Sequence, residues 1–157
     1  MPGREDYILS YIAQLRRAIA QMLNLRTTGR SEEALHVARS TQERLFGRTT
    51  AGLATLDLDE MLRLLRLDET PAAGDEKILG YATLLRETGL VYEAMDRRDS
   101  AQSCFQLALQ VTLMVVVGSK VQSPETWTAL RELLARIPAD QLHAPVQELL
   151  RLAGEPV

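Results

Sequence analysis

Apolar residues recur three or four positions apart along nearly the whole chain, and this periodicity is the feature that most restricts its fold. In the first segment the spacings are four, three, four and three, at Ile8, Ile12, Leu15, Ile19 and Met22. Such spacing places side chains on one side of an α-helix. The valines at 115–117 would suit a strand, but the sequence offers no second strand to pair with it. We therefore expect an all-α fold.

Capping residues and helix breakers divide the pattern into six or seven helices joined as antiparallel hairpins. Gly29 suits a left-handed stop after the first helix, and Ser123 followed by Pro124 is a typical helix start. Asp75 is predicted to cap the fourth helix after a break at residues 71–74. A chain of 157 residues fits one domain. We expect this domain to span residues 1–157, with helices at about 5–27, 31–46, 58–66, 76–96, 99–117, 124–137 and 145–153.

Charge and hydropathy argue against nucleic-acid and membrane partners. The net charge is −3, with +3 in residues 1–50, −5 in residues 51–100 and −1 in residues 101–157, whereas nucleic acids require a concentrated basic face. The longest nearly apolar run, residues 107–117, is shorter than the roughly 20 residues of a membrane-spanning helix. The start of the chain lacks the basic and apolar stretches of a secretory leader. We expect a cytoplasmic protein.

Residue types that carry chemistry are sparse. Cys104 is the only cysteine, and His36 and His143, the only histidines, have no second ligand at metal-binding spacing. Cys104 shares a helical face with Ala101 and Ala108, where a buried thiol is usually inert. We therefore expect no cofactor, no metal and no enzymatic activity. Carboxylates in a helical cavity, serving an enzyme or a small-ligand binder, remain the alternative.

Seven acidic residues cluster around the predicted third helix and the start of the fourth. Acids near helix N-termini complement the helix macrodipole, which favours a structural role. The alternative is an acidic patch for a basic partner. The cluster comprises Asp57, Asp59, Glu60, Asp68, Glu69, Asp75 and Glu76.

One stretch carries more information than helical periodicity. Small and large residues are interleaved across the fourth and fifth predicted helices, in the pattern Leu85-x3-Gly89-x2-Tyr92-x8-Ala101-x3-Phe105-x2-Ala108. The small residues let two antiparallel helices approach closely, and the large ones fill the space beside each contact. This spacing resembles that of a tetratricopeptide repeat. The resemblance implies a right-handed array of helical hairpins.

The repeat is degenerate. Thr88 replaces the usual leucine, Asp96 occupies the position of the turn glycine, and Leu113 occupies that of the closing proline. Residues 29–35 resemble the turn and second-helix start of another repeat. The segment Arg4-Glu5-Asp6-Tyr7-Ile8 also resembles the N-terminus of a bacterial protein family of unknown function, which again implies a helical, repeat-like protein.

The resemblance implies a groove for a protein or peptide partner. In tetratricopeptide proteins the first helix of each hairpin lines a concave groove. Two alternatives to partner binding are that the charges of this helix, Arg86 and Glu93, are solvated or that they are covered by the protein's own helices. A third is that the stripe of the first helix pairs with a second copy in a homodimer. The positions that match the groove are Thr83, Arg86, Leu90, Glu93 and Ala94.

The repeat pattern predicts that Phe105 fills the core of the hairpin. Phe105→Ala is then expected to lower the free energy of unfolding by about 3–5 kcal/mol, because it leaves a cavity in a packed interior. Urea denaturation of the two proteins measures the difference. A loss below about 1 kcal/mol would contradict the assignment.

Overall fold

The computed structural model describes residues 4–46, 58–119 and 123–154, and these segments are almost entirely helical. They contain no strand, so the predicted all-α class is confirmed. Asp57 lies outside them. The helices are α1 (Arg4–Thr27), α2 (Ser31–Phe46), α4 (Leu58–Arg66), α5 (Pro71–Ala94), α6 (Arg98–Ser119), α7 (Pro124–Arg136), the short 3-10 helix η1 (Ala139–Gln141) and α8 (Ala144–Ala153).

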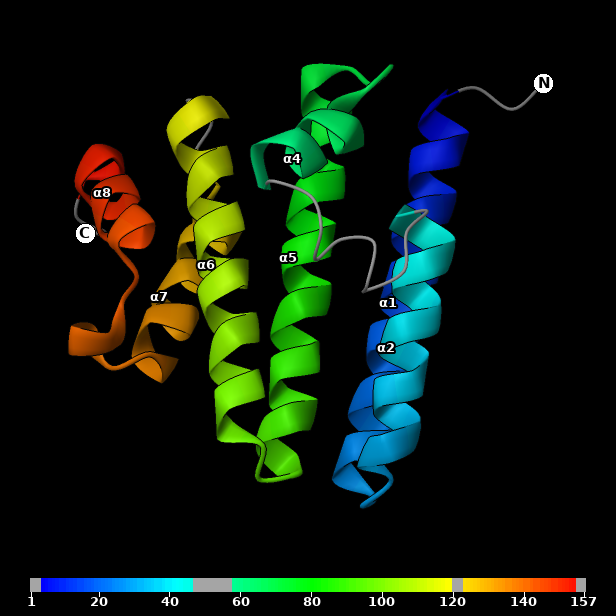
Figure 1. Ribbon diagram of the computed structural model, residues 1–157. Coiled ribbons are helices and arrows are strands. Elements are labelled where there is room, and N and C mark those ends of the chain that lie inside the picture. Colours follow the sequence, from blue (N-terminus) through cyan, green and yellow to red (C-terminus); the bar gives the residue numbers. More distant parts are fainter. Residues whose placement is uncertain (1–3, 47–57, 120–122, 155–157) are drawn as a thin grey trace.

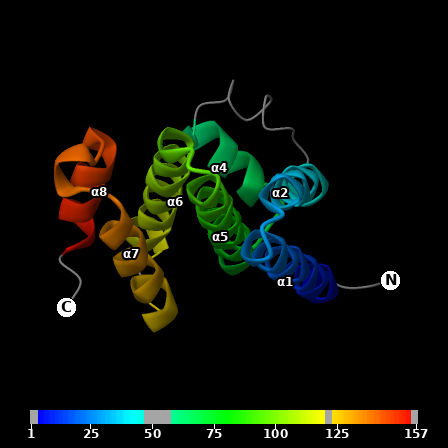
Figure 2. The same ribbon diagram turned by 90° about the horizontal axis from the view of Figure 1, so that it is seen from below.

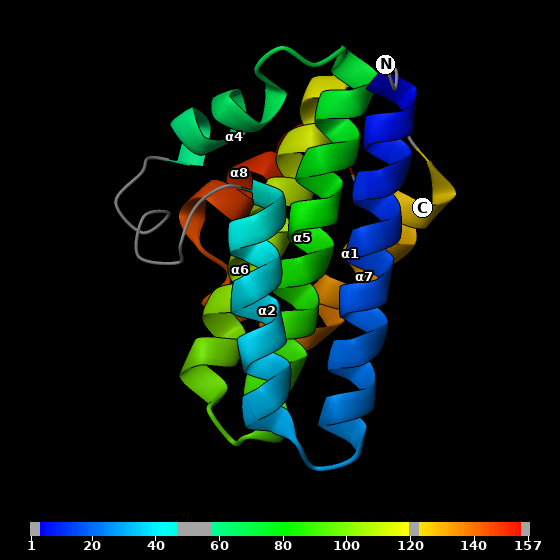
Figure 3. The same cartoon turned by 90° about the vertical axis from the view of Figure 1, so that its right-hand side faces the viewer.

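The helices form two rows with α5 near the middle (Figure 1). Seen from below, α1, α5 and α7 follow a curved inner row, while α2, α4, α6 and α8 lie on the outer side (Figure 2). Helices α1 and α2 stand side by side and both contact α5 (Figure 3). On the other side α6 contacts α5, α7 and α8. The inner row is therefore concave.

The predicted start of the fourth helix is wrong. Helix α5 begins at Pro71, and Thr70 is its N-cap, with the Thr70 hydroxyl accepting a hydrogen bond from the Ala73 amide. Proline is tolerated at the first helical position because its missing N–H would have no partner there. Gly74 lies inside the helix, where Arg66 packs closely against it. Asp75 pairs with Arg66 at 2.7 Å instead of capping the helix.

Helices α5 and α6 form the closest hairpin of the fold, as the repeat pattern predicted. A Cβ added at Gly89 would lie 2.5 Å from Cε1 of Phe105, and the Phe105 ring is fully buried. Ala101 and Ala108 are also buried at this contact. At the turn, Asp96 adopts a φ of 57°, the left-handed conformation usually taken by glycine.

Helix α1 has two apolar sides where one stripe was predicted. Its buried row packs against α2 and α5 and consists of Tyr11, Leu15, Ala18, Met22 and Leu25. Ile12 and Ile19 are only half-buried, on the flank that turns towards the inner row. The predicted stripe therefore mixes two sides of the helix. The reason is that α2 and α5 both pack against the same side of α1 and leave the flank with Ile12 and Ile19 partly uncovered.

Helix α6 has the length and apolar composition of a membrane-spanning helix, and 56% of that stretch is buried within the protein. The core helix of a water-soluble protein has the same properties. Helix α6 is packed by α5, α7 and α8, as such a core helix is. Its composition is therefore weak evidence for a membrane.

The contact between Gly89 and Phe105 predicts the effect of a single methyl group. Gly89→Ala is expected to lower the free energy of unfolding by about 1–3 kcal/mol, because the new Cβ overlaps a fully buried ring. Adding Phe105→Leu is expected to recover part of this loss. Gly118→Ala is the control: its Cβ meets nothing within 4 Å, so a gain of about 0.5–1 kcal/mol is expected. Equal effects of the two alanines in urea denaturation would contradict the close approach.

Candidate binding groove

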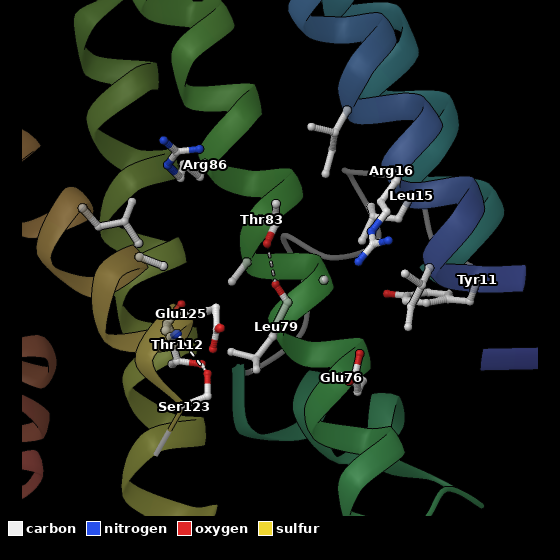
Figure 4. A pocket seen from close by; sticks show the side chains of 17 residues that line it. Tyr11, Leu15, Arg16, Glu76, Leu79, Thr83, Arg86, Thr112, Ser123 and Glu125 are labelled. Atoms are coloured by element: carbon white, nitrogen blue, oxygen red, sulfur yellow. Dashed lines mark hydrogen bonds between the residues drawn. The ribbon is translucent and has the colours of Figure 1, made fainter. Parts of the chain in front are cut away.

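The concave side of the inner row contains a cavity of about 430 Å³. Helix α5 forms its floor, and α1 and α7 form its two walls (Figure 4). Apolar side chains come from all three helices: Ile12, Leu15 and Ile19 from α1, Leu79 from α5, and Ala129 and Leu133 from α7. We call this cavity and its lining the groove.

Gly80 brings α1 onto the floor of the groove. A Cβ at this position would lie 2.9 Å from Cδ2 of Leu15 and 3.0 Å from the hydroxyl oxygen of Tyr11. The Tyr11 hydroxyl donates a hydrogen bond of 3.2 Å to the backbone carbonyl of Lys77. The position of the α1 wall therefore depends on a residue without a side chain.

Two of the five predicted groove residues line the groove. Thr83 is exposed on its floor, with its hydroxyl bonded to the Leu79 carbonyl, and Arg86 borders it. Leu90 is only 8% exposed and packs in the core shared by α5, α6 and α7. Glu93 forms an ion pair with α7, and Ala94 is exposed; neither lines the groove. The groove does not reach the later positions because α7 packs over Leu90 and pairs with Glu93.

Ion pairs join the α7 wall to the floor. The Arg86 guanidinium lies 2.9 Å from a carboxylate oxygen of Glu87 and 3.1 Å from one of Glu132 on α7. Two turns further along α5, a carboxylate oxygen of Glu93 lies 3.2 Å from the guanidinium of Arg136 on α7. The two charged residues predicted to recognise a partner thus form ion pairs with α7 within the protein.

Three other charged residues line the groove. Among the described residues, Arg16, Glu76 and Glu125 form no ion pair or hydrogen bond. Arg86 lies towards one end of the groove, and Glu76 and Glu125 lie towards the other (Figure 4). The Arg16 guanidinium lies between these ends, at about the level of Thr83 (Figure 4). Along α5, positions 76 and 86 are ten residues apart, which corresponds to about 15 Å. The unpaired charges of the groove are therefore two carboxylates at one end and the cation of Arg16 near the middle.

The two walls of the groove were not predicted from the sequence. A signal for one wall was present, because a second row on α1 has spacings of three and four: Leu9, Ile12, Arg16, Ile19 and Leu23. In the structure Leu9 and Leu23 are 64% and 46% exposed. No comparable signal marks the α7 wall, because Ala129 and Leu133 differ little from ordinary core positions.

The predicted acidic cluster is largely paired. Glu69 lies 3.7 Å from Lys77, Asp75 pairs with Arg66, and Glu60 lies 3.6 Å from Arg63. No group of three or more histidine, cysteine or carboxylate side chains suited to a metal ion occurs within the described segments. Glu76 differs from these neighbours because it points into the groove.

A second cavity of about 440 Å³ lies between α2, α4, α5 and α6, on the outer side of α5. Its described lining is largely apolar and includes Tyr81 and Cys104. Burial raises the pKa of the Cys104 thiol to about 11. Burial, and to a smaller extent the nearby Cys104, raises the pKa of Tyr81 to about 12. Both groups are therefore neutral at physiological pH. Cys104 is half-buried in the lining of this cavity and is not buried with Ala101 and Ala108 as predicted.

Comparison of the chain with protein-family models, with curated proteins and with solved structures finds no match. The geometry of the groove is therefore the basis for a functional proposal.

The raised pKa predicts slow alkylation of Cys104. At pH 8 a pKa of about 11 in place of 9.0 lowers the thiolate fraction by about 100-fold, and the thiolate is the reactive form. Mass spectrometry of iodoacetamide reactions should show a rate that rises with pH up to about 11. In denaturing urea the same thiol should react like a free cysteine. A native rate at pH 8 equal to the denatured rate would contradict the shift.

Proposed function

We propose that this protein is a scaffold that binds a segment of another protein in the groove between α1 and α7. The observation that carries the proposal is the uncovered apolar flank of α1, where Ile12 and Ile19 line the groove. Leu9 and Leu23 continue the same row beyond the lining and are exposed. Uncovered apolar surface in a concave site is typical of partner binding. A degenerate tetratricopeptide-like array, with α1, α5 and α7 as the first helices of three hairpins, agrees with this role.

The groove suits a helix or a short extended segment. Its floor between Glu76 and Arg86 is about 15 Å long, which matches about ten helical residues or about five extended ones. An amphipathic helix commonly places its apolar side in a groove of this kind. The apolar residues of the three groove helices would then contact one side of the bound segment, and Thr83 would lie beneath it.

Recognition, and not catalysis, is the activity that the lining favours. The described residues around the groove include no histidine or cysteine, and Ser123 is occupied as the N-cap of α7. The serine hydroxyl accepts a hydrogen bond from the Thr126 amide. An acyl-transfer or metal-dependent reaction would need a nucleophile with an adjacent base, or a ligand cluster.

The proposal is tested by photocrosslinking from the floor of the groove. Benzoylphenylalanine at position 83 is expected to form an adduct with a partner protein in cells that produce this chain, and mass spectrometry identifies the adduct. Position 128 is a matched control, because Thr128 is also an exposed helical threonine whose hydroxyl bonds to the carbonyl four residues earlier. Thr128 does not line the groove.

An adduct that forms at position 83 and not at position 128 would support the groove. Adducts of equal yield at both positions, or at neither, would contradict it. A crosslink from position 83 to a second copy of this chain would replace the proposal by the homo-oligomer alternative. In that case light scattering should give a mass above 17.5 kDa.

A further inference from the structure

Two carboxylates stand at the same end of the groove. Glu76 comes from the floor and Glu125 from the α7 wall, and both side chains are drawn inside the groove in Figure 4. Neither has an ion pair or hydrogen bond with another described residue. Two nearby carboxylates earlier in the chain differ from them. Glu69 pairs with Lys77, and Asp75 pairs with Arg66.

The helix macrodipole does not account for Glu76. Glu125 is the second residue of α7, where a carboxylate stabilises the helix N-terminus. Glu76, in contrast, is the sixth residue of α5, and the dipole effect falls off within the first turn. A carboxylate at this position faces the groove without a structural reason of its own.

The cations of the groove differ in their surroundings. The charge of Arg86, at the opposite end, is offset by Glu87 and Glu132. Arg16 has no partner among the described residues, and its guanidinium lies near the middle of the groove, at about the level of Thr83 (Figure 4). Within the described part of the chain, the groove is therefore net acidic at one end, with the cation of Arg16 near its middle.

We propose that the segment bound in the groove is cationic, with a lysine or arginine side chain that enters between Glu76 and Glu125. Its apolar side chains contact α1 and α7, and an acidic side chain or a terminal carboxylate of the segment lies near Arg16. This inference rests on the proposed function, because it names the chemistry of the segment that the groove binds. Charge complementarity of this kind orients the bound segment and excludes anionic ones.

The contribution of the two carboxylates to affinity is moderate. Both side chains are exposed, and exposed ion pairs contribute little each. Replacing both glutamates by glutamine is therefore expected to lower the affinity for a cationic peptide by about 3- to 10-fold. The loss should shrink at high salt, because added ions screen exposed charges.

Selection of random twelve-residue peptides displayed on phage tests the inference, because the library offers basic, neutral and acidic segments to the groove at the same time. Peptides are selected on the wild-type protein and then sorted by binding to Thr83→Trp, which fills the floor of the groove, and to Thr128→Trp. Groove-dependent peptides are those that bind the wild type and Thr128→Trp but not Thr83→Trp. Circular dichroism establishes that both variants are folded.

Groove-dependent peptides are expected to be enriched in lysine and arginine over the unselected library. Synthetic copies are then measured by fluorescence anisotropy against Glu76→Gln/Glu125→Gln. The matched control is Glu43→Gln/Asp99→Asn, which removes the same charge from exposed positions outside the groove. The groove variant should weaken binding by about 3- to 10-fold, and the control should leave it within about 2-fold.

The outcomes separate the two proposals. Groove-dependent peptides without basic enrichment, or with affinities unaffected by Glu76→Gln/Glu125→Gln, would overturn the cationic partner and leave the binding groove in place. Equal weakening by the groove and control variants would also overturn it, because the effect would then be one of net charge. A selection that yields no groove-dependent peptide would overturn the proposed function itself.

Discussion

The close approach of Gly89 to Phe105 is the contact on which the arrangement of α5 and α6 depends. A Cβ at Gly89 would lie 2.5 Å from the ring, so the distance between these helices is available only to glycine. Gly80, nine residues earlier on α5, plays the same part towards Leu15 and Tyr11 of α1. Helix α5 therefore packs closely against α1 at Gly80 and against α6 at Gly89, because neither position has a side chain. This central helix can then serve as the floor of a groove whose wall stands close beside it.

Helix α7 decides which part of α5 remains open. Its apolar residues pack over Leu90, and Arg136 reaches Glu93, so the groove does not continue along this part of α5. Thr83, near the middle of α5, stays accessible between the two walls. The same helix supplies Glu132 to Arg86 and directs Glu125 into the groove. The packing of α7 therefore determines the length of the groove, the pairing of Arg86 and the position of Glu125.

Where sequence reasoning failed, tertiary contacts supplied the missing information. The Pro71–Gly74 segment has the composition of a break, yet Thr70 caps it and Arg66 of α4 packs against Gly74, so it forms the first turn of α5. On α1 the periodic pattern indicated a helix correctly but not which side is buried. Two rows of apolar residues were present, and the choice between them depended on the positions of α2 and α5.

The sequence by itself determined the all-α class, most helix boundaries and the Gly89–Phe105 hairpin. These follow from local periodicity, from caps such as Ser123, and from small residues at spacings that one helical pair can use. Only the tertiary structure decided which predicted groove residues line the groove. Arg86 and Glu93 look alike in sequence, as charged residues two turns apart on one face. Their surroundings differ because α1 and α7, distant from each other in the chain, meet α5 at different heights, and no local pattern records where distant helices meet.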